Sequence, residues 1–330
     1  MTHPATPQQL VIFSPAGVVA DPAVLRRAVK RLKHHGFAAR ADENALARNQ
    51  RFAGTDEQRL EALHRVAQQG IDGEACIALA SRGGYGLTRL LDRVDWPLMA
   101  RSIEHGLRWV GYSDITARQL GALAHGAGGP ERVPHSHDHE HDGHCSHAGG
   151  WWAGPLACDD FGRSTDPAEL DDVTEGCFVE AMTGELEAIG FRTEAGFDGL
   201  DVTGRLWGGN LCVVLSLLGT PHFPRVKGGV LFLEDVNEHP YRIERSLLQL
   251  HQAGVLDAQR AIVLGAFTEY KKSPLDRGYN MNTVIGYLRS LTKTPILTGL
   301  PHGHVPTKVC LPVGRRATLA VQGRDAFIGW

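Results

Sequence analysis

The first half of the sequence alternates short apolar runs with segments of helical periodicity, and this order of elements constrains the fold most strongly. It is typical of a parallel β-sheet that is covered by the helices joining its strands. Strands are predicted at residues 10–14, 37–40, 75–80 and 108–111. Helices are predicted at residues 22–36, 55–70 and 115–125, with a further helix beginning at residue 87.

The second half contains strand-like runs separated by glycine-rich turns. Strands are predicted at residues 186–191, 200–206, 230–233, 261–265 and 317–321, and helices at 165–182, 211–218 and 242–253. The expected fold class is α/β, with a parallel-sheet domain followed by a mixed domain on a bent or barrel-like sheet. Because 330 residues exceed the usual size of one domain, we divide the chain into residues 1–165 and 180–330.

The composition is that of an ordinary globular protein, with 42% hydrophobic and 22% charged residues. A net charge of -3 argues against a nucleic-acid partner, which would require a basic face. We find no secretory leader and no apolar run of membrane-spanning length, so we expect a cytoplasmic protein without a membrane partner. The six cysteines are scattered, and we expect them to be reduced.

Ser113 lies where a buried strand is predicted to turn sharply into a helix. A hydroxyl at such a turn projects above the sheet edge, as a nucleophile requires, and the next amide, that of Asp114, points into the same space. The helix that follows directs its positive end toward an oxyanion. The segment departs from the hydrolase elbow because Ile115 stands where glycine is usual, and a simple helix cap is the alternative role for Ser113.

A glycine-rich segment at residues 81–86 follows another buried strand. Gly83 and Gly84 have no Cβ, so their amides can approach a ligand and complete an oxyanion hole with the amide of Asp114. The segment lacks the third glycine of a dinucleotide site and the Lys-Ser/Thr pair of a P-loop. A tight turn without a function is the alternative.

A nucleophilic serine needs a base, and histidine suits this role near neutral pH. Among the 17 histidines, His302 and His304 lie on a loop rich in glycine and proline, where catalytic groups are often found. Glu234 ends an apolar strand, where a carboxylate can orient an imidazole. The alternative for Glu234 is a helix cap or an ion pair with Arg242 or Arg245.

Five groups of segments resemble a known family, the LD-carboxypeptidases together with the related microcin-immunity serine peptidases. They are residues 81–86, 111–116, 208–211 with 219–221, 232–236 with 240–242, and 303–304 with 312–314. Their order and spread cover nearly the whole chain. The resemblance implies an N-terminal domain like that of class I glutamine amidotransferases, a C-terminal domain with a bent sheet, and an active site between them.

The resemblance also implies roles for the site residues: Ser113 as nucleophile, His304 as base and Glu234 as the carboxylate that orients the base. Asn210 lies in a shared segment and is expected to contact the substrate beside the oxyanion hole. The implied chemistry is hydrolysis through an acyl-enzyme, without metal or cofactor, that releases D-alanine from the L,D bond of a murein tetrapeptide. Family members act in the cytoplasm during peptidoglycan recycling and form homodimers, so the same is expected here.

Two features depart from the family pattern. Residues 151–155 read Trp-Trp-Ala-Gly-Pro where the family usually carries histidine before Gly-Pro. Residues 127–150 form a histidine-rich insertion without apolar periodicity, which we predict to be a loop. Zn, Ni or Cu could bind there, weakly and adventitiously, with a modest regulatory or sequestering role as the alternative, and catalysis should not require it. The histidines concerned are His135, His137, His139, His141, His144 and His147.

Two other functions are compatible with these residues. The same triad could act on acylated amino acids or aminoacyl nucleotides, as in the microcin-immunity relatives, with Trp151, Trp152 or Trp207 stacking on a base. Alternatively, the chain could be a metal-binding protein on an inactive hydrolase scaffold. Hydrolysis that resists chelators and requires Ser113 would exclude this last function.

Overall fold

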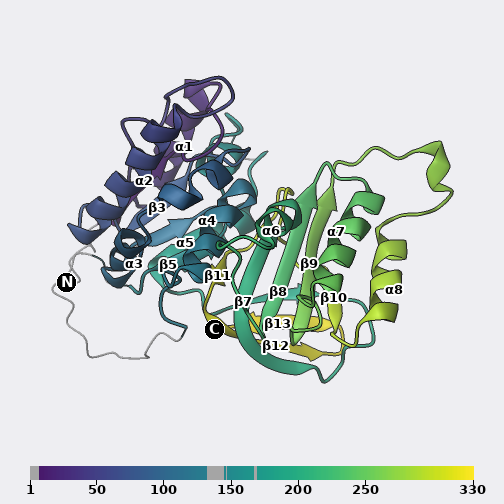
Figure 1. The fold of residues 1–330 in the computed structure, drawn as a ribbon. Helices are drawn as coiled ribbons and strands as arrows, with labels where there is room; N and C mark the ends of the chain where they lie inside the picture. Colours follow the sequence, from purple (N-terminus) through teal and green to yellow (C-terminus); the bar gives the residue numbers. More distant parts are fainter. Residues whose placement is uncertain (1–6, 132–144, 146, 167–168) are drawn as a thin grey trace, which may run out of the picture.

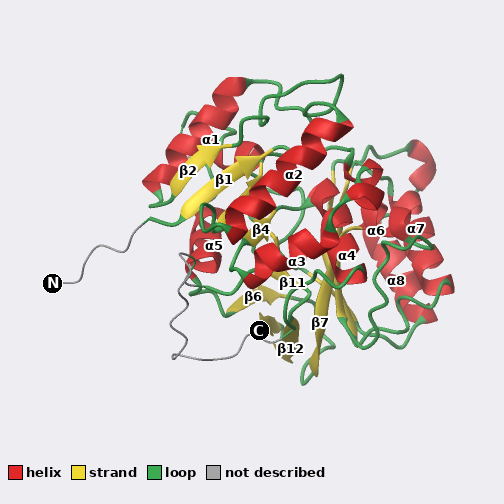
Figure 2. Cartoon of the chain, turned by 60° about the vertical axis from the view of Figure 1, so that its left-hand side comes forward, coloured by secondary structure: helices red, strands yellow, loops and turns green. Residues whose placement is uncertain are grey.

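The computed structural model describes residues 7–131, 145, 147–166 and 169–330. Two β-sheets form its centre, one built mainly from the first half of the chain and the other from the second half (Figure 1). Helices flank the strands of both sheets (Figure 2). Every helix among these residues is too short or too polar to cross a membrane.

The first sheet has six strands in the order β11-β5-β4-β3-β1-β2. Five of them pair in parallel, and β11, which comes from the second half of the chain, pairs antiparallel with β5. The strands are β1 (Gln9–Phe13), β2 (Ala38–Ala41), β3 (Ile77–Ala80), β4 (Arg108–Val110), β5 (Gly150–Ala153) and β11 (Leu311–Val313). The accompanying helices are α1 (Pro22–His34), α2 (Asp56–Ile71), α3 (Trp96–Glu104), α4 (Thr116–Ala124) and α5 (Asp172–Thr183).

The predictions for β1 to β4 and for α1, α2 and α4 are confirmed, with each boundary within two residues. The helix predicted to begin at residue 87 is wrong, because two short 3-10 turns, Leu87–Arg89 and Leu91–Arg93, precede α3. A continuous helix would place Pro97 in its interior, where the ring clashes with the preceding turn. Instead, the Asp95 side chain caps a new helix by accepting the N–H of Leu98.

The second sheet has seven strands in the order β10-β9-β8-β7-β12-β13-β6 and is open, with β10 and β6 at its edges. The strands are β6 (Ala188–Arg192), β7 (Asp201–Asn210), β8 (Val230–Val236), β9 (Ala261–Thr268), β10 (Ile296–Thr298), β12 (Arg316–Gln322) and β13 (Asp325–Gly329). The helices are α6 (Leu211–Leu217), α7 (Pro240–Gln252) and α8 (Met281–Leu291). All five predicted strands and both helices after residue 210 are confirmed, whereas β10, β13 and α8 were not predicted.

The long strand β7 explains why this sheet bends. Its residues 201–205 pair antiparallel with β12, and its residues 206–210 pair in parallel with β8. One strand therefore joins an antiparallel half to a parallel half, as Figure 1 shows for β7 beside β8 and β12. The predicted bent sheet is confirmed, and the described strands do not close into a barrel.

The end of β7 also brings the two halves of the chain together. The backbone N–H of Asn210 donates to the hydroxyl of Thr116, at the start of α4, over 3.1 Å. A Cβ at Gly209 would lie 2.4 Å from that hydroxyl, so only glycine permits this close approach. The segment that follows β4 therefore packs directly on the carboxyl end of β7.

A disulfide joins Cys76 and Cys145, whose Cα atoms lie 5.4 Å apart. Cys76 directly precedes β3, and Cys145 belongs to the segment that leads into β5. These strands flank β4, so the fold brings together two cysteines that are far apart in the sequence. The expectation of reduced thiols is wrong for this pair, whereas Cys158, Cys177, Cys212 and Cys310 are free thiols.

Candidate active site

Ser113 follows β4 in a left-handed backbone conformation, with φ of 65°, which is unusual for a residue other than glycine. Its side chain caps neither the short turn Ser113–Ile115 nor α4. Its hydroxyl oxygen instead lies 3.2 Å from Nε2 of His304. The alternative role as a helix cap is therefore wrong, and the strained turn has the form expected of a nucleophile elbow.

His304 connects Ser113 to a buried carboxylate. Its Nδ1 lies 2.8 Å from Oε2 of Glu234, a residue in β8 that is 1% exposed. A carboxylate can only accept, so Nδ1 carries the proton and Nε2 is left to accept the proton of the serine hydroxyl. The ion pairs suggested for Glu234 do not form, because Arg242 pairs with Glu238 instead.

His302 is excluded from this chain of hydrogen bonds. It is fully buried, and its Nδ1 donates to the carbonyl of Val309 over 3.2 Å. Burial lowers the pKa of His302 to about 4, so its ring is neutral at pH 7. The two histidines of this loop therefore have different surroundings. His304 contacts Ser113, whereas the buried ring of His302 packs perpendicular to the ring of Phe232.

Gly83 and the amide of Asp114 lie directly beside the serine. A Cβ at Gly83 would be 2.8 Å from both Cβ and Oγ of Ser113 and 3.5 Å from the amide nitrogen of Asp114. Gly84 follows with φ of 106°. The carboxylate of Asp114 points elsewhere, accepting the N–H of Leu87 over 3.0 Å, and burial raises its pKa to about 6. Only the backbone of Asp114 therefore faces Ser113.

The side chain of Asn210 has a structural use. Its amide oxygen accepts the N–H of Val213 and caps α6, and its Nδ2 donates to Asp235 over 3.1 Å. Such a cap is what an asparagine before a helix usually provides. The backbone of Asn210 lies near the turn at Ser113, whereas its side chain is held by Val213 and Asp235.

Both halves of the chain match models of one protein family. Residues 10–128 match the model of the LD-carboxypeptidase N-terminal domain, and residues 203–319 match the model of the LD-carboxypeptidase C-terminal domain. A murein tetrapeptide carboxypeptidase of Pseudomonas aeruginosa is 30% identical over 94% of this chain and 92% of the relative.

The chain belongs to the LD-carboxypeptidase family. A muramoyltetrapeptide carboxypeptidase from Oxalobacter formigenes has a similar structure, with a TM-score of 0.81 and 36% identity over 97% of this chain and 98% of its own. MccF in complex with glutamyl sulfamoyl guanosine shares the fold, with a TM-score of 0.79 and 19% identity over 99% of this chain and 97% of its own. The protein is thus a serine-type carboxypeptidase of this family.

Three residues beside the triad of this LD-carboxypeptidase were not predicted from the sequence. The ring of Tyr112 lies 4.9 Å from that of His304, and the ammonium of Lys308 lies 5.3 Å from the centre of the Tyr112 ring. Lys308 also forms a buried ion pair with Asp160. Because these residues are far apart along the chain, no local pattern could have indicated their contact.

The tryptophans suggested as stacking platforms are buried in the LD-carboxypeptidase. Trp151 stacks on Trp109 inside the first sheet, and Trp207 donates to Gln259 in the second half. Trp152 is also buried and packs against Trp330. The prediction that they could stack on a base is wrong, because strands β5 and β7 turn these side chains into the core.

The possible metal site lies almost wholly outside the described residues, which include only His147 of its six histidines. His147 packs against Gly184, where a Cβ would lie 2.7 Å from its Nδ1. Among the described residues, no three potential ligands cluster closely enough to hold a metal ion.

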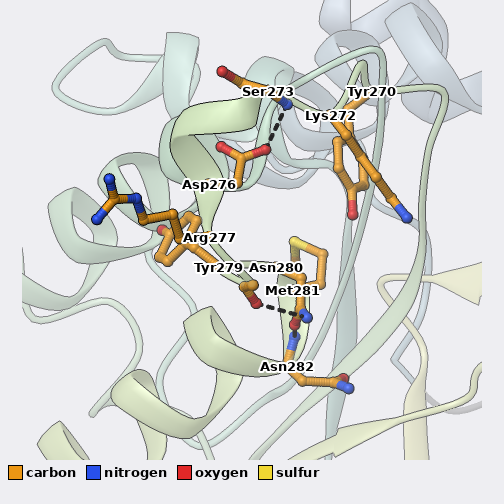
Figure 3. Close-up of a pocket in the computed structure, with 10 residues that line it drawn as sticks. Tyr270, Lys272, Ser273, Asp276, Arg277, Tyr279, Asn280, Met281 and Asn282 are labelled. Carbon is orange, nitrogen blue, oxygen red and sulfur yellow. Dashed lines mark hydrogen bonds between the residues drawn. The ribbon is translucent and has the colours of Figure 1, made fainter.

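A separate cavity of about 560 Å³ lies within the loop that joins β9 to α8. Figure 3 shows Tyr270 and Lys272 on one side and Asp276 and Arg277 on the other. The cavity includes none of the triad residues. Thr268, two residues before Tyr270 in the sequence, donates to the carbonyl of His304.

Proposed function

We propose that this LD-carboxypeptidase hydrolyses the L,D bond of murein tetrapeptides and releases the terminal D-alanine. The observation that carries the proposal is the hydrogen-bonded chain from Ser113 through His304 to Glu234, which joins residues from both halves of the sequence. The murein tetrapeptide carboxypeptidase of P. aeruginosa, at 30% identity, supports this substrate class.

In the proposed mechanism, Nε2 of His304 takes the proton of the Ser113 hydroxyl as its oxygen attacks the carbonyl of the L-centre. Glu234 keeps Nδ1 protonated and stabilises the imidazolium that forms. The N–H groups of Asp114 and of Gly83 or Gly84 donate to the oxyanion. His304 then protonates the amine of the leaving D-alanine, and in the second half-reaction it activates the water that hydrolyses the acyl-enzyme. No step requires a metal or a cofactor.

We also propose that the protein acts in the cytoplasm, during peptidoglycan recycling, and as a homodimer. These proposals rest on the resemblance to the family. Cell fractionation tests the location, and sedimentation at several protein concentrations tests the dimer. A protein recovered only outside the cytoplasm, or only as a monomer, would remove the corresponding proposal.

Mass spectrometry of products tests the reaction. Wild-type protein incubated with an L,D-tetrapeptide should release D-alanine, in buffer with or without a chelator. Ser113→Ala and His304→Ala should each lower kcat by about 10⁴-fold or more, since each removes a member of the triad. His302→Ala should retain turnover, because His302 does not contact Ser113.

An aminoacyl sulfamoyl adenosine serves as the competing substrate in the same assay. Release of its amino acid without cleavage of the tetrapeptide would favour the microcin-immunity-like activity. Hydrolysis of neither compound would overturn the proposed substrate class. Turnover that survives in Ser113→Ala would overturn the mechanism.

A further inference from the structure

Helix α5 lies along residues 306–310 of the loop that leads into β11. The carboxylate of Asp171, at the start of α5, accepts the hydroxyl of Thr307. Further along the helix, Sγ of Cys177 accepts the N–H of Cys310 over 3.2 Å. Residues three positions apart lie on the same face of a helix, so the residue midway between Asp171 and Cys177 is expected to face the same loop.

Thr174 is that residue, and it makes the central contact. Its side chain is buried, with 3% of the residue exposed. Its hydroxyl donates to the carbonyl of Pro306 over 2.9 Å and accepts the N–H of Lys308 over 2.8 Å. Backbone polar groups need partners, and one side chain here satisfies two of them in a segment without regular structure. Both groups lie within four residues of His304.

The next residues of α5 attach the helix to the first half of the chain. Oε2 of Glu175 lies 3.0 Å from Nε2 of His35, and its Oε1 lies 3.6 Å from Nη1 of Arg31 in α1. The ring of Phe178 packs on that of Phe37, which directly precedes β2. One part of α5 therefore rests on the elements around the first sheet, while another part contacts the loop.

His304 is thus held from two directions. Thr268, at the end of β9, donates to the carbonyl of His304 over 3.2 Å and connects it to the second sheet. Thr174 connects the residues that follow His304 to α5, and through α5 to the first half, which carries Ser113. The distance of 3.2 Å between Nε2 of His304 and the hydroxyl of Ser113 consequently depends on both connections.

We propose that Thr174 is a positioning residue, whose hydroxyl holds the loop so that Nε2 of His304 stays within reach of the Ser113 hydroxyl. Its two hydrogen bonds go to the backbone of residues 306 and 308, so it acts on His304 through the loop. A displacement of about 1 Å can lower a rate by about 100-fold. This inference rests on the proposed function, in which His304 is the base.

Thr174→Val removes the hydroxyl and keeps the shape of the side chain. With the tetrapeptide, kcat should fall by about 10- to 100-fold and KM should change by less than about twofold, because proton transfer is impaired and binding is not. Thr174→Ser keeps the hydroxyl and should restore most of the rate. Thr174→Ala, which lacks the hydroxyl and introduces no clash, is a second variant and should lose kcat as Thr174→Val does.

Thr294→Val is the matched control. Thr294 is 8% exposed, and its hydroxyl donates to the carbonyl of Leu256 over 3.2 Å. It directly precedes the pairing of β10 with the start of β9, at the opposite end of β9 from Thr268. Thr294→Val should lower the midpoint of thermal unfolding about as much as Thr174→Val does, and its kcat should equal that of wild type. The comparison separates the loss of a buried hydrogen bond from a displacement of His304.

Labelling with a fluorophosphonate separates this inference from the proposed function, because the reagent reacts with an activated serine and needs no peptide. Wild type should be labelled at Ser113, and Thr174→Val should be labelled about 10- to 100-fold more slowly. If wild type is labelled but hydrolyses no tetrapeptide, the proposed substrate class fails, and the labelling rates alone decide the role of Thr174.

Three results would overturn the inference. Thr174→Val and Thr174→Ala could be turned over and labelled at wild-type rates. Thr294→Val could lose as much rate as Thr174→Val, which would assign the effect to a general loss of stability. Thr174→Ser could be as slow as Thr174→Val, which would assign the effect to the methyl group of Thr174 and not to its hydroxyl.

Discussion

At Ser113 the backbone occupies a conformation that costs on the order of 1–3 kcal/mol for a residue with a Cβ. Two local features keep it there. Gly83 packs against the serine side chain, and the hydroxyl is within hydrogen-bond distance of His304. The position of the Ser113 side chain therefore depends on the absence of one methyl group at residue 83.

Gly83→Ala should lower kcat/KM by at least about 100-fold, because the added Cβ would lie 2.8 Å from Oγ of Ser113 and displace it. Steady-state kinetics with the tetrapeptide measure this effect. The midpoint of thermal unfolding should change little. Gly286→Ala is the matched control, since a Cβ there meets no atom within 4 Å, and it should have wild-type activity. Equal activities of the two variants would contradict the role of Gly83.

His302 should make the free energy of unfolding depend on pH. Its pKa of about 4 in the fold lies below its ordinary value of 6.5, so the unfolded chain binds a proton first as the pH falls. The neutral His302 ring makes its full contribution to the free energy of unfolding above pH 6.5. This contribution is lost as the pH falls toward 4, and the total loss is about 3 kcal/mol. Burial raises the pKa of Asp114 and Asp235 to about 6, and these groups act in the opposite direction.

A variant separates these effects. His302→Gln can still donate to the Val309 carbonyl but does not titrate. It should be less stable than wild type at pH 7, and the difference should shrink as the pH falls to 4. Urea unfolding of both proteins across this range measures the difference. A difference that is independent of pH would show that the fold does not hold His302 neutral.

At the scale of elements, β7 and the Cys76–Cys145 disulfide organise the two halves of the chain. β7 joins the parallel and antiparallel parts of the second sheet, and its end packs on α4. The disulfide ties the segment before β5 to the start of β3, across a sequence separation of 69 residues. Cys145, which lies within the histidine-rich insertion of residues 127–150, is thereby held at the start of β3.

The disulfide should stabilise the protein by up to about 4 kcal/mol, because it restricts a long loop of the unfolded chain. Urea unfolding of wild type and Cys145→Ala should therefore differ without a reducing agent and converge when dithiothreitol is added. Alkylation of the denatured protein should label four cysteines before reduction and six after it. Six labels before reduction would show that the cross-link does not form.

At the scale of the whole molecule, the halves are connected in several places. β11 follows the loop of His302 and His304 in the sequence yet completes the first sheet beside β5. His222, after α6, lies within hydrogen-bond distance of both Asp92 and His125 from the first half, at 2.9 Å each. We propose that residues 1–165 and 180–330 form two domains, and that the second domain contributes β11 to the sheet of the first.

A fragment of residues 1–165 should consequently be less stable than the same region in the full chain. It lacks both β11 and α5, so the edge of β5 and the core residues that α5 covers lose their partners. Hydrogen exchange of β3 and β4 amides in the fragment and in the full chain measures the effect. Equal protection in both would show that the first part folds independently of β11.

The sequence alone determined the features that depend on neighbouring residues. Apolar periodicity predicted most strands and helices, and the strand-to-helix turn at Ser113 and the glycines at 83 and 84 indicated where chemistry could occur. Pro97 and Asp95 were also local signals for the start of α3, although the apolar pattern from residue 87 concealed them. The segments that resemble the family then implied that Ser113, His304 and Glu234 form a triad. The spacing of these three residues in the sequence could not have indicated that they meet.

Only the tertiary structure decided which side chains meet. It separated His304, which contacts Ser113, from His302, two residues away, because the loop directs one ring toward the elbow and the other into the core. It placed β11 in the first sheet and joined Cys76 to Cys145. Such contacts join residues distant in sequence, and their energies depend on burial and distance, which a local pattern of residues does not contain.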